Sequence, residues 1–331
     1  MLKERDIISL FKEIVKVTPS PSFLLKGIGD DAAVLEFAET YFLCTTDLLV
    51  ENSHFRWEWM PPFALGYKSL AVNLSDIAAM GGKPECFTVS IGLSEDFPEE
   101  KLFGILKGLE SIAKKYKVSL IGGDTVRSEK TVINIMVTGR VEKDQVLFRS
   151  GAQVGDVIFV SGCLGDAAAG LAILEQGIED EFFSDLIKAQ LLPEPEVALG
   201  CYLAQTGLVH AMIDISDGIA SDLSWICQES GLGAFIHQDL LPISPACKKA
   251  AKRLKQDYLS WALGGGEDYR LLFTASQETA DELKQKVAEE LKREIFIIGE
   301  ITAGNRVYLI HNGQKKDITG KGYSHFYPRN V

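Results

Sequence analysis

The chain has 331 residues, of which 46% are hydrophobic and 24% are charged, an ordinary balance for a globular protein with room for about two domains. Its formal charge of −12 argues against a nucleic-acid surface, which needs a basic footprint, and no apolar run reaches the ~18 residues of a membrane span. The mixed-charge N-terminal stretch lacks the apolar core of a signal peptide, and the six cysteines form no CxxC pair, so we expect a cytoplasmic protein.

The first half of the chain alternates predicted helices and strands. Apolar residues at helical spacing predict a helix over residues 2–17, which Pro19 and Pro21 stop. Further helices are predicted over about 63–80 and 98–117, and strands over 41–47, 89–93, 118–121 and 131–141. A polar loop at 148–151 marks the expected boundary between an N-terminal domain, residues 1–148, and a C-terminal domain, residues 149–331.

The second half continues the same alternation, which is typical of an α/β protein. Strands are expected at 156–161, at about 211–217, and at 234–237, 269–274, 294–300 and 307–311. Helices are expected after Asp166, over about 181–191 and 195–208, through Ser230, and over 245–257 and 277–293. Asn312 and Gly313 predict a tight turn after the last of these strands.

Two adjacent carboxylates, Asp30 and Asp31, project from a glycine-rich turn at residues 27–34. Like charges at this spacing repel each other, so they need solvent or a counter-charge. A solvated turn is the ordinary interpretation. The alternative is a hard cation such as Mg²⁺, which prefers oxygen ligands.

More acids of this kind follow along the chain, each near the end of a predicted element: Asp47, Asp76, Asp124, Asp214 and Asp217. Any one of them alone is better interpreted as a turn or cap residue. Together they favour a site that holds more than one Mg²⁺ between carboxylates and phosphates. The sequence has neither a Walker loop nor the glycine loop, HRD and DFG motifs of protein kinases.

Eight short motifs, in this order over nearly the whole chain, resemble the thiamine-monophosphate kinases of the aminoimidazole-ribonucleotide synthetase superfamily. They are GIGDDAAV at 27–34, TTD at 45–47 with His54 downstream, NLSDIAAMG at 73–81, IGGDT at 121–125, RSG at 149–151, DISDG at 214–218, GGEDY at 265–269 and GYSHF at 322–326. The order of eight motifs is far more specific than any single one.

This resemblance implies ATP- and Mg²⁺-dependent phosphorylation of thiamine monophosphate to thiamine diphosphate, the last step of thiamine diphosphate biosynthesis. It also implies a two-domain α/β (α+β) fold with mixed sheets, an ATP cleft between the domains, and a homodimer formed through the N-terminal sheet. The implied Mg²⁺ ligands are Asp30, Thr45, Thr46, Asp47, Asp76, Asp124, Asp214 and Asp217. The implied ATP contacts are Gly123, Asp124, Arg149 and Ser216, and the implied substrate contacts are His54, Glu267 and Tyr323.

A phosphate acceptor is already an anion, so no catalytic general base is expected among the residues. Asp31 is expected only to support the turn. Arg270 stands where the family pattern suggests an acid, Gln153 where a lysine is common, and Leu106 where an aromatic is frequent, so the adenine contact stays unassigned. Two alternatives remain open: a related ATP-dependent synthetase or cyclo-ligase, and a non-catalytic module that binds Mg²⁺ and ATP.

Overall fold

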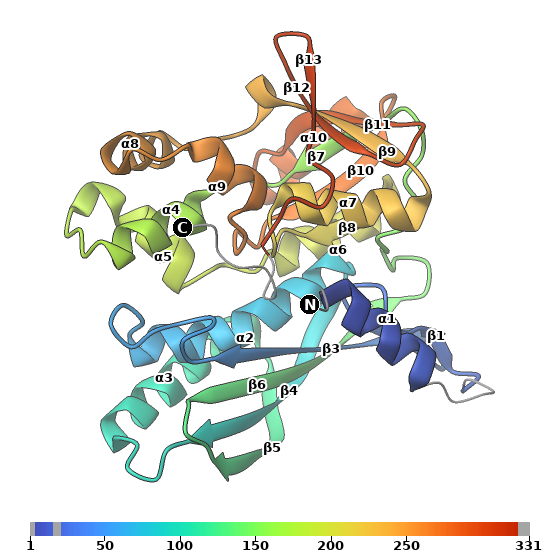
Figure 1. The fold of residues 1–331 in the computed structure, drawn as a ribbon. Coiled ribbons are helices and arrows are strands. Elements are labelled where there is room, and N and C mark those ends of the chain that lie inside the picture. The colour runs from blue at the N-terminus through green and yellow to red at the C-terminus, as the bar shows by residue number, and fades with distance from the viewer. Residues whose placement is uncertain (1–3, 16–20, 324–331) are drawn as a thin grey trace.

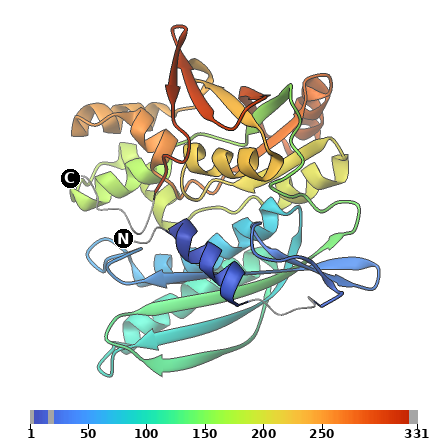
Figure 2. The ribbon, with the colours of Figure 1, turned by 45° about the vertical axis from the view of Figure 1, so that its right-hand side comes forward.

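The computed structural model describes residues 4–15 and 21–323 and contains two β-sheets with helices between them (Figure 1). Figure 2 shows the same arrangement turned by 45° about the vertical axis, with the blue and green sheet below and the orange and red strands above. None of the helices in the described ranges is long and apolar enough to span a bilayer.

The first sheet has six strands in the order β1-β2-β3-β6-β4-β5. All neighbouring strands are antiparallel except β4 and β5, which are parallel, so the sheet is mixed as expected. The bounds are β1 Leu24–Lys26, β2 Ala33–Phe37, β3 Thr40–Val50, β4 Lys83–Leu93, β5 Ser119–Arg127 and β6 Val132–Glu142.

Helices α2 (Pro62–Ala79) and α3 (Glu99–Tyr116) cover one face of this sheet. The first helix of the chain, α1, spans Glu4–Ile14. The sequence predicted the first helix over 2–17, and Val17 lies outside the described residues. Helix α2 is buried on nearly every side because it packs on β3 and β6 below and on α6 and β8 above. A helix in that position is apolar all round, and its few polar side chains must therefore find partners inside the protein.

The second sheet has seven strands in the order β13-β12-β9-β11-β7-β10-β8, with β9 and β12 as its parallel pair. Its strands are β7 Asp156–Val160, β8 Val209–Asp214, β9 Gly233–His237, β10 Leu271–Ser276, β11 Phe296–Thr302, β12 Val307–His311 and β13 Gln314–Asp317. Successive β7 side chains enter different cores on opposite faces. Asn312 and Gly313 make the predicted turn, since His311 pairs with Gln314.

Helices cover both faces of this second sheet. Helix α7 packs on one face and α6 and α10 on the other. Their bounds, with the remaining helices of this half, are α4 Asp166–Glu175, α5 Ser184–Leu191, α6 Val197–Thr206, α7 Ile219–Ser230, α8 Pro245–Leu254, α9 Tyr258–Gly264 and α10 Ala280–Leu291, with short 3₁₀ turns η1 Glu181–Phe183 and η2 Gln238–Leu240.

Several predicted elements differ from those observed. The strand predicted over 41–47 runs on to Val50, the strand predicted over 89–93 begins at Lys83, and the sequence analysis does not predict β1, β2 or β13. Strand β5 does not end before Gly122 but runs on to Arg127, because Gly123 lets it approach β4; a Cβ there would lie 1.9 Å from the Val89 carbonyl oxygen. Helix α9 was missed, since Asp257 does not end a helix but caps a new one by accepting from the Leu259 N–H at 3.0 Å.

Candidate active site

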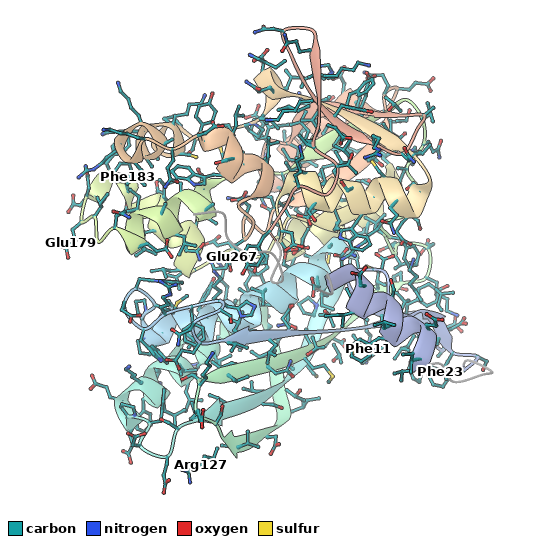
Figure 3. All side chains as sticks on the ribbon, in the orientation of Figure 1. Phe11, Phe23, Arg127, Glu179, Phe183 and Glu267 are labelled. Atoms are coloured by element: carbon teal, nitrogen blue, oxygen red, sulfur yellow. The ribbon has the colours of Figure 1, made fainter. Side chains whose placement is uncertain are left out.

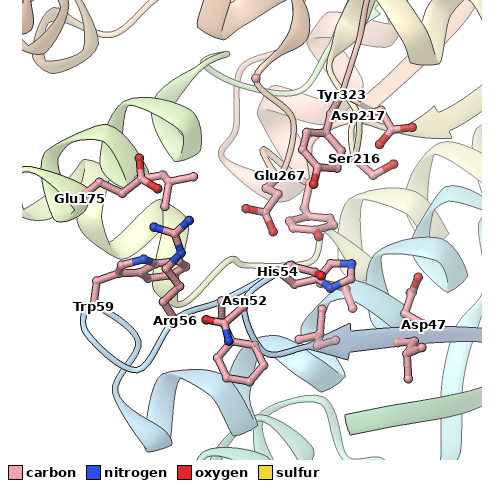
Figure 4. Close-up of a pocket in the computed structure, with 18 residues that line it drawn as sticks. Asp47, Asn52, His54, Arg56, Trp59, Glu175, Ser216, Asp217, Glu267 and Tyr323 are labelled. Carbon is pink, nitrogen blue, oxygen red and sulfur yellow. The ribbon is translucent and has the colours of Figure 1, made fainter. Parts of the chain in front are cut away.

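A pocket of about 310 Å³ lies between the two sheets (Figure 4). The lower wall comes from the end of β3 and the loop after it, including Asp47 and His54. The upper wall comes from α4, from the loop after β8 and from the segment before β10. Figure 3 shows Glu267 at the junction of the two halves. The predicted site residues that line the pocket are Asp47, His54, Ser216, Asp217, Glu267 and Tyr323.

Next to this pocket, three carboxylates meet from different parts of the chain. Asp31 precedes β2, Asp76 is in the last turn of α2, and Asp214 ends β8; one oxygen of each lies within 4.8 Å of the others. The Thr45 hydroxyl donates to Asp76 and the Ser75 hydroxyl donates to Asp214, each at 2.5 Å. These hydroxyls orient the carboxylates.

Ionisation of the clustered carboxyl groups is energetically unfavourable, so their pKa values are raised. Burial, followed by the repulsion of Asp31, raises the pKa of Asp214 to about 8. Burial and the Asp31 charge also raise the pKa of Asp47 to about 6, and burial with the Asp47 charge raises that of Asp76 well above its ordinary value. Carboxylates that resist ionisation in this way are typical of functional sites.

The hydrogen bonding of the two Asp31 carboxylate oxygens indicates whether the residues of this group fit a cation. Its Oδ1 accepts from Arg149 Nη2 at 2.7 Å, but its Oδ2 is buried and finds no hydrogen-bond partner among the described residues. A buried carboxylate oxygen without a donor is costly, and two further carboxylates beside it increase that cost. A divalent cation with oxygen ligands satisfies all three, so the residues present fit Mg²⁺.

The structure puts Asp31 at the centre of this group, and Asp30 at its margin. Asp30 Oδ1 accepts from the Arg149 backbone N–H at 3.1 Å, and its Oδ2 lies 3.3 Å from Lys26 Nζ. Burial and the Asp31 charge still raise the pKa of Asp30 to about 6. The sequence analysis predicts Asp30 as a ligand and Asp31 as a support of the turn; the structure groups Asp31 with Asp76 and Asp214, and the role of Asp30 as a ligand stays a prediction.

Two other predicted ligands point away from the group. Alternation along β3 places Thr45 and Asp47 on the face toward α2 and places Thr46 on the opposite face. There the Thr46 hydroxyl donates to the Ile135 carbonyl at 3.0 Å and accepts from Asn134 Nδ2 at 2.9 Å. The structure therefore does not bring the Thr46 side chain to Asp76.

Asp124 is also on this outer face, on the edge strand β5. Strand register aligns Leu48, Asn134, Ser90 and Asp124 in one row, so Asp124 is about three strand spacings, or about 14 Å, from β3. Its carboxylate is exposed and accepts from the Thr125 N–H at 2.9 Å. Gly123, its predicted partner in ATP binding, lies on the same strand.

Glu267 is held by two residues that the sequence analysis did not identify. Lys68 Nζ, on a side chain only 2% exposed, lies 2.7 Å from Glu267 Oε1 and donates to the Gln190 carbonyl at 3.0 Å. Gln190 Nε2 donates to Glu267 Oε2 at 2.8 Å. The backbone of Glu267 is left-handed, with φ of 61°, so these contacts fix a strained position.

His54 and Tyr323 also line the pocket, and each forms a hydrogen bond with the backbone of a neighbouring segment. His54 Nδ1 accepts from the Val50 N–H at 3.0 Å, which assigns the ring proton of the neutral form to Nε2. The Tyr323 N–H donates to the Asp217 carbonyl at 2.9 Å and brings the last described residue to the pocket. The remaining part of the motif at 322–326 lies outside the described residues.

The unusual Arg270 does not belong to the pocket. It donates to the buried Glu196 carboxylate at 2.8 Å, and Arg293 donates to the same oxygen. Arg270 therefore takes part in a cluster of charged residues with Glu196 and Arg293, away from the pocket. Gln153 and Leu106 are exposed and do not line the pocket either.

Comparisons with known proteins find relatives over nearly the whole chain. Residues 29–141 match the model of the AIR synthase related protein N-terminal domain, and residues 153–312 match that of the C-terminal domain. The chain is 40% identical to the thiamine-monophosphate kinase of Buchnera aphidicola subsp. Acyrthosiphon pisum, covering 91% of this chain and 93% of that relative. For the thiamine-monophosphate kinase of Bacillus subtilis the identity is 36%, covering 97% and 99%.

A solved structure described as "AaThiL complexed with AMPPCP and TMP" is similar over 98% of this chain and 97% of its own. The TM-score is 0.85 and the identity 32%. The likeness covers both sheets and the helices between them, so the fold expected from the motifs is confirmed.

The carboxylate group predicts an unusual dependence of stability on pH. Unfolded carboxyl groups have pKa values near 3.9, whereas Asp47 and Asp214 reach about 6 and about 8 in the fold. These two groups bind more protons in the folded chain in this window, so their contribution to the free energy of unfolding falls as the pH rises from about 4 to about 8. Mg²⁺ binds the ionised form, and its stabilising effect therefore grows over the same window.

Thermal unfolding with and without Mg²⁺, at about pH 5 and about pH 8.5, measures this effect. We expect Mg²⁺ to raise the Tm by several degrees at the higher pH and little at the lower. Asp214→Asn should lose most of the difference, while Asp239→Asn, an exposed acid outside the pocket, should keep it. Equal Mg²⁺ effects at both pH values would contradict the assignment.

Proposed function

The chain belongs to the thiamine-monophosphate kinase family of AIR synthase related proteins, and we propose that it transfers the γ-phosphoryl group of ATP to thiamine monophosphate. The product, thiamine diphosphate, makes this the last step of that cofactor's biosynthesis. The main observation in support of this proposal is that Asp31, Asp76 and Asp214 converge beside a pocket that is lined by His54 and Glu267. The kinase relatives favour this reaction over the synthetase, cyclo-ligase and non-catalytic alternatives.

The reaction needs positioning more than proton transfer. An oxygen of the acceptor phosphate attacks the γ-phosphorus in line, a new P–O bond forms, and the bond to the β,γ-bridging oxygen breaks, so that ADP leaves with the electron pair. Because the attacking oxygen is already anionic, no base has to remove a proton. This accounts for a pocket with many carboxylates and no assigned catalytic base.

The chain's own acids would hold Mg²⁺. Asp31, Asp76 and Asp214 form the inner group, and Thr45, Asp47 and Asp217 extend it toward the pocket. Asp30 remains a predicted ligand from the turn. When bound, Mg²⁺ neutralises phosphate charge and allows two polyanions to approach in an acidic protein.

Arg149 and Ser216 are proposed to contact ATP in the cleft between the two domains, whose boundary we keep at residues 148 and 149. Arg149 uses Nη2 on Asp31, and its guanidinium has further N–H donors for phosphate oxygens. Ser216 lines the pocket directly before α7. The Arg149–Asp31 contact thus links the nucleotide contacts to the carboxylate group.

The substrate contacts proposed for this pocket are His54, Glu267 and Tyr323. The Nε2–H of His54 can donate to the phosphate, and the fixed Glu267 carboxylate attracts the cationic thiazolium. Tyr323 provides an aromatic face for the same cation. We place the reaction in the cytoplasm.

We further propose a homodimer in which the sites are shared. Strand β5 is at the sheet edge and exposes Leu120, Ile121 and Val126 by 54–61%, an arrangement that invites pairing with a second chain. Thr46 and Asp124 both face the surface that such a partner would cover. Gly123 and Asp124 of one chain would then serve ATP and Mg²⁺ in the site of the other.

An assay of purified protein with Mg²⁺, ATP and thiamine monophosphate tests the activity. We expect thiamine diphosphate to form, and Asp76→Asn to lower kcat by about 100-fold or more because the variant loses one carboxylate of the inner group. Glu110→Gln, on the exposed face of α3, should be normal. Absence of product from the wild-type protein would refute the proposed reaction.

Mixed dimers test the sharing of the sites. Asp124→Asn and Asp76→Asn chains should each be inactive alone, yet random exchange should restore up to about a quarter of the activity, because half the dimers contain one intact site of two. A mixture of Asp47→Asn and Asp76→Asn should stay inactive, since both changes affect the same chain's site. Lack of recovery in the first mixture, with exchange verified by native mass spectrometry, would contradict sharing.

A further inference from the structure

Glu267 lies in a backbone segment, residues 265–269, that connects α9 to β10 through an unusual conformation. The φ angles of Gly266, Glu267 and Tyr269 are 70°, 61° and 48°, all in the left-handed region. This conformation costs glycine little, but it is unfavourable for glutamate and tyrosine, and it persists only where the surrounding structure fixes it. The segment therefore needs anchors.

The first anchor is the loop after β8. The Glu267 N–H donates to the Ser216 carbonyl at 2.8 Å, and the Tyr269 N–H donates to the Ile215 carbonyl at 2.9 Å. A Cβ at Gly266 would lie 2.5 Å from the Ser216 carbonyl oxygen, so the two backbones approach each other closely. These contacts hold the segment on the side of the sheet.

The second anchor is the side chain of Asp268, which reaches the first turn of α4. Its Oδ2 accepts from the Gly165 N–H at 2.7 Å, and its Oδ1 accepts from the Ala167 N–H at 3.3 Å. Gly165, at the N-cap of α4, has no side chain with which to cap the helix. Asp268 therefore provides the cap from about 100 residues away, and its negative charge is favourable at this end of the helix.

Asp268 is close to the substrate pocket without being part of its wall. Among the described residues that line the pocket are its two neighbours, Glu267 and Tyr269, but not Asp268 itself. A Cβ at Gly265 would lie 2.4 Å from Ala168 Cβ, so the segment packs directly on α4. Burial raises the pKa of the Asp268 carboxyl to about 7, although its two N–H donors lower it. Any effect of Asp268 on a bound substrate must therefore pass through its neighbours.

We propose that Asp268 is a positioning residue that keeps Glu267 in its left-handed conformation, an inference that rests on the proposed function. The segment is held between α4 and the loop after β8, so Glu267 projects toward Lys68 and Gln190. Without the bonds to α4, the strained backbone relaxes and the Glu267 carboxylate leaves the place where it meets the thiazolium. Asp268 thus supports binding of thiamine monophosphate and has no part in the binding of ATP.

Asp268→Asn tests this role, because its amide nitrogen cannot accept a hydrogen bond from either backbone N–H. We expect KM and Kd for thiamine monophosphate to rise about tenfold or more, as befits the loss of a bond to a charged group, while KM for ATP stays within about twofold. Asp166→Asn is the matched control, since Asp166 begins the same helix but accepts from the Ser244 hydroxyl. It should keep both values, and an equal loss there would overturn the assignment.

A double-mutant cycle shows whether Asp268 acts through Glu267. In the Glu267→Gln background, Asp268→Asn should change Kd for thiamine monophosphate by less than about twofold. Two effects that multiply in full would contradict the proposed role. If Asp268→Asn does not fold, Asp268→Ser replaces it, because a hydroxyl accepts from one N–H group without placing an amide donor against the other.

A crystal structure of the Asp268 variant separates this proposal from the proposed reaction. We expect the φ angle of Glu267 to depart from 61° and its 2.7 Å contact with Lys68 to be lost. This result supports the positioning role even if the wild-type protein forms no thiamine diphosphate, an outcome that refutes only the reaction. Unchanged values in a folded variant overturn the positioning role, and normal turnover of the wild type would then leave the reaction intact.

Discussion

Mutual repulsion among buried carboxylates is the constraint on which the rest of the structure depends. Asp31, Asp76 and Asp214 come from a turn, a helix and a strand, and only the packing of both sheets around α2 brings their oxygens within 4.8 Å. Without a counter-charge the arrangement opposes folding, because burial and repulsion both disfavour the ionised groups. Arg149 provides part of that charge through Asp31, and a bound divalent cation would provide the remainder.

Helix α2 transmits this constraint to the substrate pocket. Its buried polar residues have different partners: Ser75 donates to Asp214, Asp76 belongs to the carboxylate group, and Lys68 ties Glu267 of the upper half to α2. Because α2 is buried, water cannot replace the partners of these polar side chains, and the packing around the helix fixes each contact. One rigid helix thereby contacts both the carboxylate group and Glu267, which suits a reaction that depends on positioning.

The sequence was informative where local chemistry decides the structure. The acid at the end of β8, Asp214, and the turn at Asn312 and Gly313 follow from short-range patterns, whereas Asp47, predicted at a strand end, lies inside β3. The roles of Asp30 and Asp31 could not be separated in this way, because adjacent residues in a turn differ only in direction. That direction depends on Arg149, more than 100 residues away.

Long-range partners explain the other differences between sequence and structure. Lys68 reads as one charged residue in an apolar helix, and its partner Glu267 is distant in the chain. Arg270 departs from the family pattern, and its partner Glu196 lies 74 residues before it in the chain. Asp124 has the expected type and spacing, but strand register places it on the outer face of the sheet, which no local pattern reveals.

Anomalous diffraction from crystals grown with Mn²⁺ in place of Mg²⁺ tests the central claim most directly. The account predicts a peak bounded by oxygens of Asp31, Asp76 and Asp214, at coordination distances of about 2.1 Å. A peak only at other acids, or none at this group when the crystal pH is high enough to ionise it, would contradict the claim that a divalent cation resolves the repulsion.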